Sequence, residues 1–156
     1  MTTIRCAQFG SISSGTNRAE DLIPAFGWEL AGLLEKQSQR FPRKEYRSLI
    51  REAARWNANA GNVSDADYTD DLLRALSDAL DYFSPPYGYF GAHSYDGADY
   101  GFWLIEDVER QVELRVSDLS EMPAGYSGEL LCINDHGSVT LYNAYKGKLK
   151  MVWALV

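Results

Sequence analysis

A histidine and two aspartates lie close together in an aromatic, glycine-rich stretch of this 156-residue chain. The stretch PPYGYFGAHSYDGADYGFWL, residues 85–104, contains His93, Asp96 and Asp99. An imidazole beside carboxylates can bind a metal ion or transfer a proton. These residues are therefore candidates for chemistry, and what they can do depends on the local structure of the stretch.

The same stretch predicts a β-hairpin, because Asp96-Gly97 is typical of a two-residue hairpin turn. With this turn, Phe90 lies opposite Trp103, and strand alternation places both on the face toward the core. His93 and Asp99 then point to opposite faces and cannot share one metal ion. We therefore expect no metal site and no cofactor here.

A structural role is the interpretation we favour for the three polar residues. Asp96 would serve the turn, Asp99 would cap a backbone donor, and His93 would pack edge-on against Tyr100. The opposite face of the hairpin is still the better candidate for a binding surface. The candidate binding surface of the hairpin comprises Tyr89, His93, Tyr95, Asp96, Asp99 and Tyr100.

Signatures of nucleophilic or metal catalysis are absent from the sequence. It contains no Gly-x-Ser-x-Gly, no P-loop, no His-Glu-x-x-His and no Cys-x-x-Cys. The second histidine, His136, falls in the turn sequence NDHG, where we expect it to be solvated. We assign no catalytic residues and lean against an enzyme.

A second group of candidate residues is positively charged. Arg43, Arg47, Arg51 and Arg55 recur every four residues and form one stripe on a predicted helix over 43–59. The next predicted helix is rich in aspartate. The stripe could bind nucleic acid, or the two helices could be antiparallel neighbours whose Arg and Asp side chains pair at their edges. We favour the second interpretation.

The elements that position these residues change character at Pro85-Pro86. Before it, apolar spacing predicts three helices, the first over about 22–37 with Pro24 in its first turn. A start near Asn17 would place Pro24 inside that helix, where it removes a hydrogen bond. After Pro85-Pro86, residues that alternate between apolar and polar, with short turns between them, predict strands.

We therefore predict one α+β domain over residues 1–156, with a helical part, 1–86, and a β part, 87–156. Three N-terminal helices would pack on one face of a C-terminal antiparallel β-sheet of about five to six strands in a meander. The last strand, Leu149–Val156, is apolar on both faces, so we expect it to be buried. Either the loop at 117–128 or a second copy of the chain, as a homodimer, would cover it.

Composition narrows the class of partner and the compartment. The net charge is −7 and the pI is about 4.8, which disfavours non-specific binding to nucleic acid or an anionic membrane. Cys6 and Cys132 are far apart and are expected to be buried free thiols, which suits the cytoplasm. There is no signal-peptide pattern and no apolar run long enough to span a membrane.

The hairpin also carries a resemblance. YFGAHSYDGADYGFW, residues 89–103, resembles a motif of small uncharacterised proteins of phages and integrated elements: Tyr-Phe-Gly-x-His, a Gly-Asp-Gly-x-Asp core, then Gly-Phe-Trp. Tyr95 stands where that pattern has its first glycine. The segments at 15–26, 116–125 and 134–142 are also similar. The resemblance implies a phage or mobile-element origin, and no activity.

These observations together predict an acidic accessory protein that binds a host macromolecule in the host-cell cytoplasm, with a host defence protein as the leading target. The abundant Tyr and Trp residues, which are enriched at interface hot spots, favour this hypothesis. A first alternative is a small-ligand binder or enzyme that uses the 88–104 hairpin. A second is a nucleic-acid-binding module that uses the arginine stripe.

Overall fold

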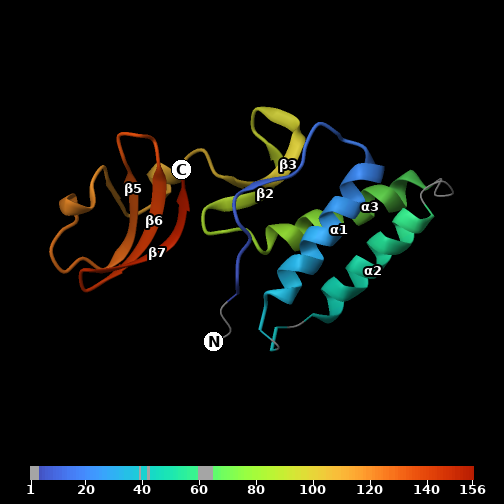
Figure 1. The fold of residues 1–156 in the computed structure, drawn as a ribbon, viewed down its shortest axis with the longest axis horizontal. Helices are drawn as coiled ribbons and strands as arrows, with labels where there is room; N and C mark the ends of the chain where they lie inside the picture. The colour runs from blue at the N-terminus through green and yellow to red at the C-terminus, as the bar shows by residue number, and fades with distance from the viewer. Residues whose placement is uncertain (1–3, 39, 42, 60–64) are drawn as a thin grey trace. The chain divides into compact units, whose positions relative to one another are not determined.

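Two compact units make up the chain, residues Met1–Leu104 and Ile105–Val156. The computed structural model describes residues 4–38, 40–41, 43–59 and 65–156. The fold is α+β, as predicted, and the three long helices lie in the N-terminal part (Figure 1). The division falls after Leu104 instead of at Pro86, and the single domain stays a prediction.

The first unit combines three helices with a three-stranded antiparallel sheet of strand order β1-β3-β2. Helix α1 packs against both α2 and α3 (Figure 1). The elements are β1 Gly10–Ser13, α1 Ala19–Glu35, α2 Lys44–Ala58, α3 Ala66–Asp81, β2 Gly88–His93 and β3 Asp96–Leu104. Strand β1, which precedes the helices, was not predicted.

The core of this unit forms where α1 and α3 meet the sheet. Phe26 of α1 makes an edge-on contact with Phe90 of β2, with ring centroids 5.0 Å apart. Phe90 in turn lies 5.0 Å from Phe102 of β3. The fully buried side chains include Ile23, Phe26, Leu30, Leu33, Leu76, Leu80, Phe83 and Phe102. Such burial is the main source of stability for helices of this length.

Helix α1 begins earlier than predicted, so Pro24 lies inside it and not in its first turn. The early start is stabilised locally. The Thr16 hydroxyl accepts a hydrogen bond from the Arg18 N–H and donates one to the Asp21 carboxylate. Asp21 also places a negative charge in the first turn, where the helix dipole favours it. These contacts offset the hydrogen bond that Pro24 cannot donate.

The predicted hairpin exists, but its register differs by one residue. The turn falls at Ser94 and Tyr95, so Phe90 lies opposite Phe102, not Trp103. The pairing shifts between Ala92, which lies opposite Tyr100, and His93, which lies opposite Asp96, so the hairpin contains a bulge next to its turn. Phe102 is therefore the buried core residue on β3, and Trp103 faces the other way. This register is favoured because it places two phenylalanines on the core face, where Phe102 is 0% exposed and Phe90 8% exposed.

The second unit is a four-stranded sheet of order β4-β5-β6-β7. Its elements are α4 Val108–Gln111, β4 Leu114–Val116, a 3₁₀ turn Leu119–Glu121, β5 Gly128–Ile133, β6 Val139–Tyr145 and β7 Lys148–Leu155. Strands β4 and β5 are parallel, while the other pairs are antiparallel. The prediction of one antiparallel meander is therefore wrong, because the strands form two sheets and one pair is parallel.

Strand β7 is an edge strand of this sheet, so the prediction that Leu149–Val156 is largely buried is also wrong. Trp153 is buried against the sheet, but Met151 is 60% exposed. Lys148 and Lys150 are exposed, and a bulge interrupts the pairing with β6. Edge lysines and bulges oppose pairing with another strand, which is how such an edge avoids aggregation. The homodimer stays a prediction.

We predict that Phe102→Ala lowers the free energy of unfolding by about 3–5 kcal/mol, because it removes a fully buried aromatic ring. Urea denaturation followed by circular dichroism measures the change. Tyr95→Ala is the control, since Tyr95 is 88% exposed and its loss should leave stability nearly unchanged. Equal stability of the two variants would contradict the observed register.

Candidate functional site

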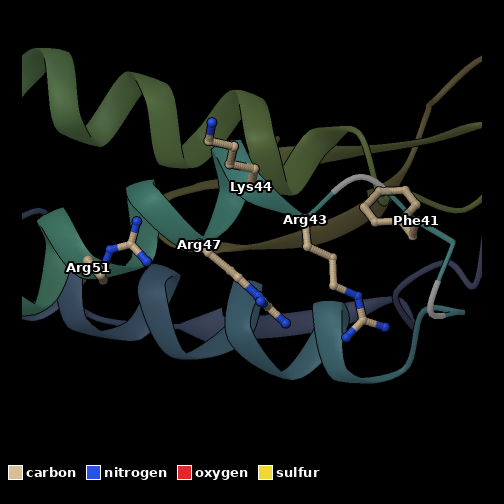
Figure 2. A pocket seen from close by; sticks show the side chains of 5 residues that line it. All are labelled: Phe41, Arg43, Lys44, Arg47 and Arg51. Carbon is tan, nitrogen blue, oxygen red and sulfur yellow. The ribbon is translucent and has the colours of Figure 1, made fainter.

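An open groove lies along the outer face of α2. It has a volume of about 410 Å³ and is lined by Phe41, Arg43, Lys44, Arg47 and Arg51. Figure 2 shows Arg43 and Arg47 on the α1 side of the helix and Lys44 on the α3 side. Four of the five lining residues carry a positive charge, so the groove suits an anionic ligand.

The packing of α2 determines which way the arginines point. Ala53 and Trp56 are buried, and the Trp56 indole N–H donates a hydrogen bond to the Thr69 hydroxyl of α3, 3.1 Å away. Arg47 is nine residues from Trp56, which is about half a turn around the helix axis. Burying the Trp56 side therefore turns Arg47 outward, and Arg51, one turn further on, follows it.

Helices α2 and α3 are antiparallel, as predicted. Trp56 near the end of α2 meets Thr69 near the start of α3, and Tyr46 near the start of α2 lies 6.2 Å from Tyr82 at the end of α3. The predicted Arg–Asp pairs between them are, however, not found in the described part of the chain. The ion pairs found there are Arg18–Glu20, Arg74–Asp71 and Arg115–Glu109.

The reason for the missing pairs lies in the sequence of α2. Glu52 is one turn before Trp56, and Glu45 is two turns before Glu52, so two carboxylates follow the Trp56 side of α2, and the basic residue that Figure 2 shows toward α3 is Lys44. The arginine stripe is on another side of the helix and does not reach the aspartates. Over the residues that the structure describes, the guanidinium groups of Arg47, Arg51 and Arg55 have no hydrogen-bond or ion-pair partner.

Arg43 differs from the other arginines of the stripe. Its guanidinium donates hydrogen bonds to the carbonyls of Gln37 and Ser38, just after the end of α1. A cation just beyond the end of a helix complements the negative end of its dipole. Its buried Nε has no partner within the described residues. Arg43 therefore joins α1 to α2 and also lines the groove.

Phe41 lies at one end of the groove (Figure 2) and belongs to an aromatic cluster. Phe41 stacks on Tyr46 with centroids 5.9 Å apart and lies 5.7 Å from Phe83. Burial, and then the nearby Tyr82 and Glu45, raise the pKa of Tyr46 above its usual value. The Tyr46 hydroxyl is therefore neutral at physiological pH and adds no negative charge to the basic groove.

The six residues of the predicted hairpin surface do not lie together. His93 is on the same face as Tyr89 and contacts Trp103 edge-on, with centroids 4.6 Å apart, in place of the expected Tyr100. Tyr100 is on the core side, where it lies 5.8 Å from Phe26 and donates a hydrogen bond to Asn17. The one-residue change of register is the cause.

The remaining hairpin residues have local structural roles. Asp96 accepts a hydrogen bond from the Ala98 N–H at 3.0 Å, and Asp99 accepts one from the Ser11 hydroxyl of β1. Asp99 thus bonds a side chain, not the backbone donor we expected. Tyr95 is exposed at the tip. Across the described ranges, no three His, Cys, Asp or Glu side chains form a group that could hold a metal ion.

Neither cysteine is set up for nucleophilic chemistry. Both are free, but Cys6 is exposed and Cys132 half-buried, so the prediction that they are buried is wrong. Neighbouring protein atoms partly desolvate the Cys6 thiol even so, and this raises its pKa. Burial, and then Asp118 and Glu121, raise the pKa of Cys132. A raised pKa favours the thiol over the reactive thiolate.

The chain matches no protein-family model, no curated protein and no solved structure. No helix in the described part of the chain has the length and apolar character needed to cross a membrane. The four-residue spacing of the arginines predicted the stripe, whereas Phe41 was not recognised as part of the site.

We predict that Arg43→Met lowers the free energy of unfolding by about 1–2 kcal/mol, because the carbonyls after α1 lose a charged donor. Arg47→Met is the matched control and should change stability by less than about 0.5 kcal/mol, since Arg47 is exposed and unpaired. Thermal and urea denaturation would measure both. A larger loss in Arg47→Met than in Arg43→Met would contradict these roles.

Proposed function

We propose that this protein binds nucleic acid, with the arginine stripe of α2 contacting the phosphate backbone. The observation that carries the proposal is that Arg47, Arg51 and Arg55 project outward without any partner among the described residues. Arginine is suited to this role, because its planar guanidinium can donate two parallel hydrogen bonds to one phosphate.

The spacing of the stripe favours a long anion over a single small one. Residues four apart on a helix are separated by about 6 Å along its axis, so the stripe from Arg43 to Arg55 extends about 18 Å. A nucleic-acid backbone offers negative charge repeatedly over such a length. The open groove beside the stripe also leaves room for a chain to pass along it.

The distribution of charge is consistent with binding on one side only. Residues 40–55 contain six basic side chains and two carboxylates, although the chain as a whole carries a net charge of −7. The negative charge on the rest of the protein repels a polyanion. Salt screens this repulsion over longer distances, so a polyanion close to α2 is attracted mainly by the basic residues there. We therefore expect binding that is moderate in affinity and strongly dependent on salt.

The other expectations from the sequence stay predictions. Binding to a host defence protein and origin in a phage or mobile element are not tested by the geometry. The six-residue binding surface predicted on the hairpin is less well supported. Tyr100 lies on the core side of β3, Asp96 accepts a hydrogen bond within the hairpin, and Asp99 accepts one from β1.

The double variant Arg47→Glu/Arg51→Glu should bind fluorescein-labelled (dT)20 at least about tenfold more weakly than the native protein, because two charged hydrogen-bond donors are replaced by repelling carboxylates. Fluorescence anisotropy measures this affinity. For the native protein, the logarithm of the binding constant should fall with the logarithm of salt concentration with a slope of about −2 to −3, as expected for three or four phosphate contacts to a single strand.

Lys148→Glu/Lys150→Glu is the matched control. It makes the same change in net charge at two exposed lysines of β7 and should retain most of the affinity. Equal losses in the two double variants would mean that net charge alone matters and would contradict a site on α2. Tighter binding to poly-L-glutamate than to (dT)20 would point to an acidic protein partner and overturn the proposal.

A further inference from the structure

Trp28 is an exposed tryptophan on α1. Its side chain is 77% exposed, whereas Trp56 and Trp153 are buried. Within the described ranges, its indole N–H has no hydrogen-bond partner and its ring stacks on no other ring. A large aromatic surface left in water is unfavourable for the isolated protein, so its position deserves a physical explanation.

The contact between α1 and α2 shows where this ring lies. A Cβ built on Gly27 would be 3.2 Å from the Cβ of Ala53, so α1 and α2 touch at these two residues. Successive residues are about 100° apart around a helix, so Phe26 and Trp28 lie on opposite sides of Gly27. Phe26 is in the core. Trp28 is therefore on the outer side of the helix contact.

The arginines of α2 lie on that side as well. Around the axis of α2, Trp56 and Arg47 lie on opposite sides of Ala53, and Trp56 is the buried one. Arg47 is therefore also on the outer side of the contact. Arg51 is two residues from Ala53, and Trp28 is one residue from Gly27, so the two residues are at about the same level along the helices. The indole and the stripe border one surface.

Gly32 keeps one side of the indole open. It is one turn after Trp28, and helical side chains lean toward the preceding turn, so a longer residue at 32 would lie over the ring. No atom is within 4 Å of a Cβ built at Gly32, so crowding does not require glycine there. Glycine nevertheless weakens a helix interior relative to alanine. Glycine at position 32 lowers helix stability slightly, but it leaves the Trp28 ring accessible to a ligand.

We infer that the nucleic acid bound here is single-stranded, with one base stacked on Trp28 while Arg47 and Arg51 contact its phosphates. This inference rests on the proposed function. A single strand can offer an unpaired base to an aromatic ring, whereas the bases of a duplex are already paired and stacked. The pairing of an exposed indole with a basic stripe is the arrangement that such strands require.

The test compares three probes: (dT)20, a 20-base-pair duplex and inorganic polyphosphate. Trp28→Ala should weaken binding of (dT)20 by about 5- to 150-fold, the effect of losing one stacked base. It should leave binding of polyphosphate unchanged, since polyphosphate has no base. Trp28→Phe should recover part of the affinity, and Gly32→Leu should weaken (dT)20 binding while Trp28 is still present.

Tyr95→Ala, which removes an equally exposed ring from the hairpin, is the matched control and should bind (dT)20 normally. All variants are checked for folding by thermal denaturation. Binding that requires Arg47 and Arg51 but is unaffected by Trp28→Ala, or that is as tight for the duplex, would overturn the single-strand inference and leave the proposed function standing. No binding of either nucleic acid would overturn both.

Discussion

The close approach of α1 and α2 at Gly27 and Ala53 is the constraint on which the arrangement of the candidate site depends. Neither residue has a side chain long enough to hold the helices apart, and the gap between their Cβ positions is only 3.2 Å. This contact fixes the rotation of both helices about their axes. The same rotation that buries Phe26 and Trp56 exposes Trp28 and Arg47. The core and the candidate site therefore both depend on how α1 and α2 pack.

A second close approach has a similar effect in the sheet. Gly101 of β3 lies against the backbone of Gly10 in β1, and any side chain at 101 would collide with the Gly10 carbonyl. The pairing of these strands holds β3 in the register that turns Phe102 inward. Tyr100 then faces α1, and Trp103 joins His93 on the other side. The residues of the hairpin that looked most functional are thereby divided between two faces.

Charge is segregated in this protein because neighbouring helices pack through selected sides. Helix α3 is acidic and the outer side of α2 is basic, yet α2 packs against α3 through Trp56, on the side that also carries Glu45 and Glu52. The arginines are left in water, where an unpaired guanidinium is well solvated and costs little. An unpaired cation of this kind is free to exchange water for a phosphate, which a cation already bound to Asp would do less readily.

The sequence by itself determined the α+β class, the three helices, the hairpin at 88–104 and the four-residue arginine stripe. These features follow from the period of the apolar residues and the spacing of the arginines. A helix satisfies its own backbone hydrogen bonds, and residues three or four apart in the sequence determine the character of each face. Only the tertiary structure decided the register of β3, the parallel pairing of β4 with β5, the edge position of β7 and the direction in which the arginines point. Each of these depends on partners far away in the chain, and a shift of one residue in a strand exchanges its two faces at little local cost.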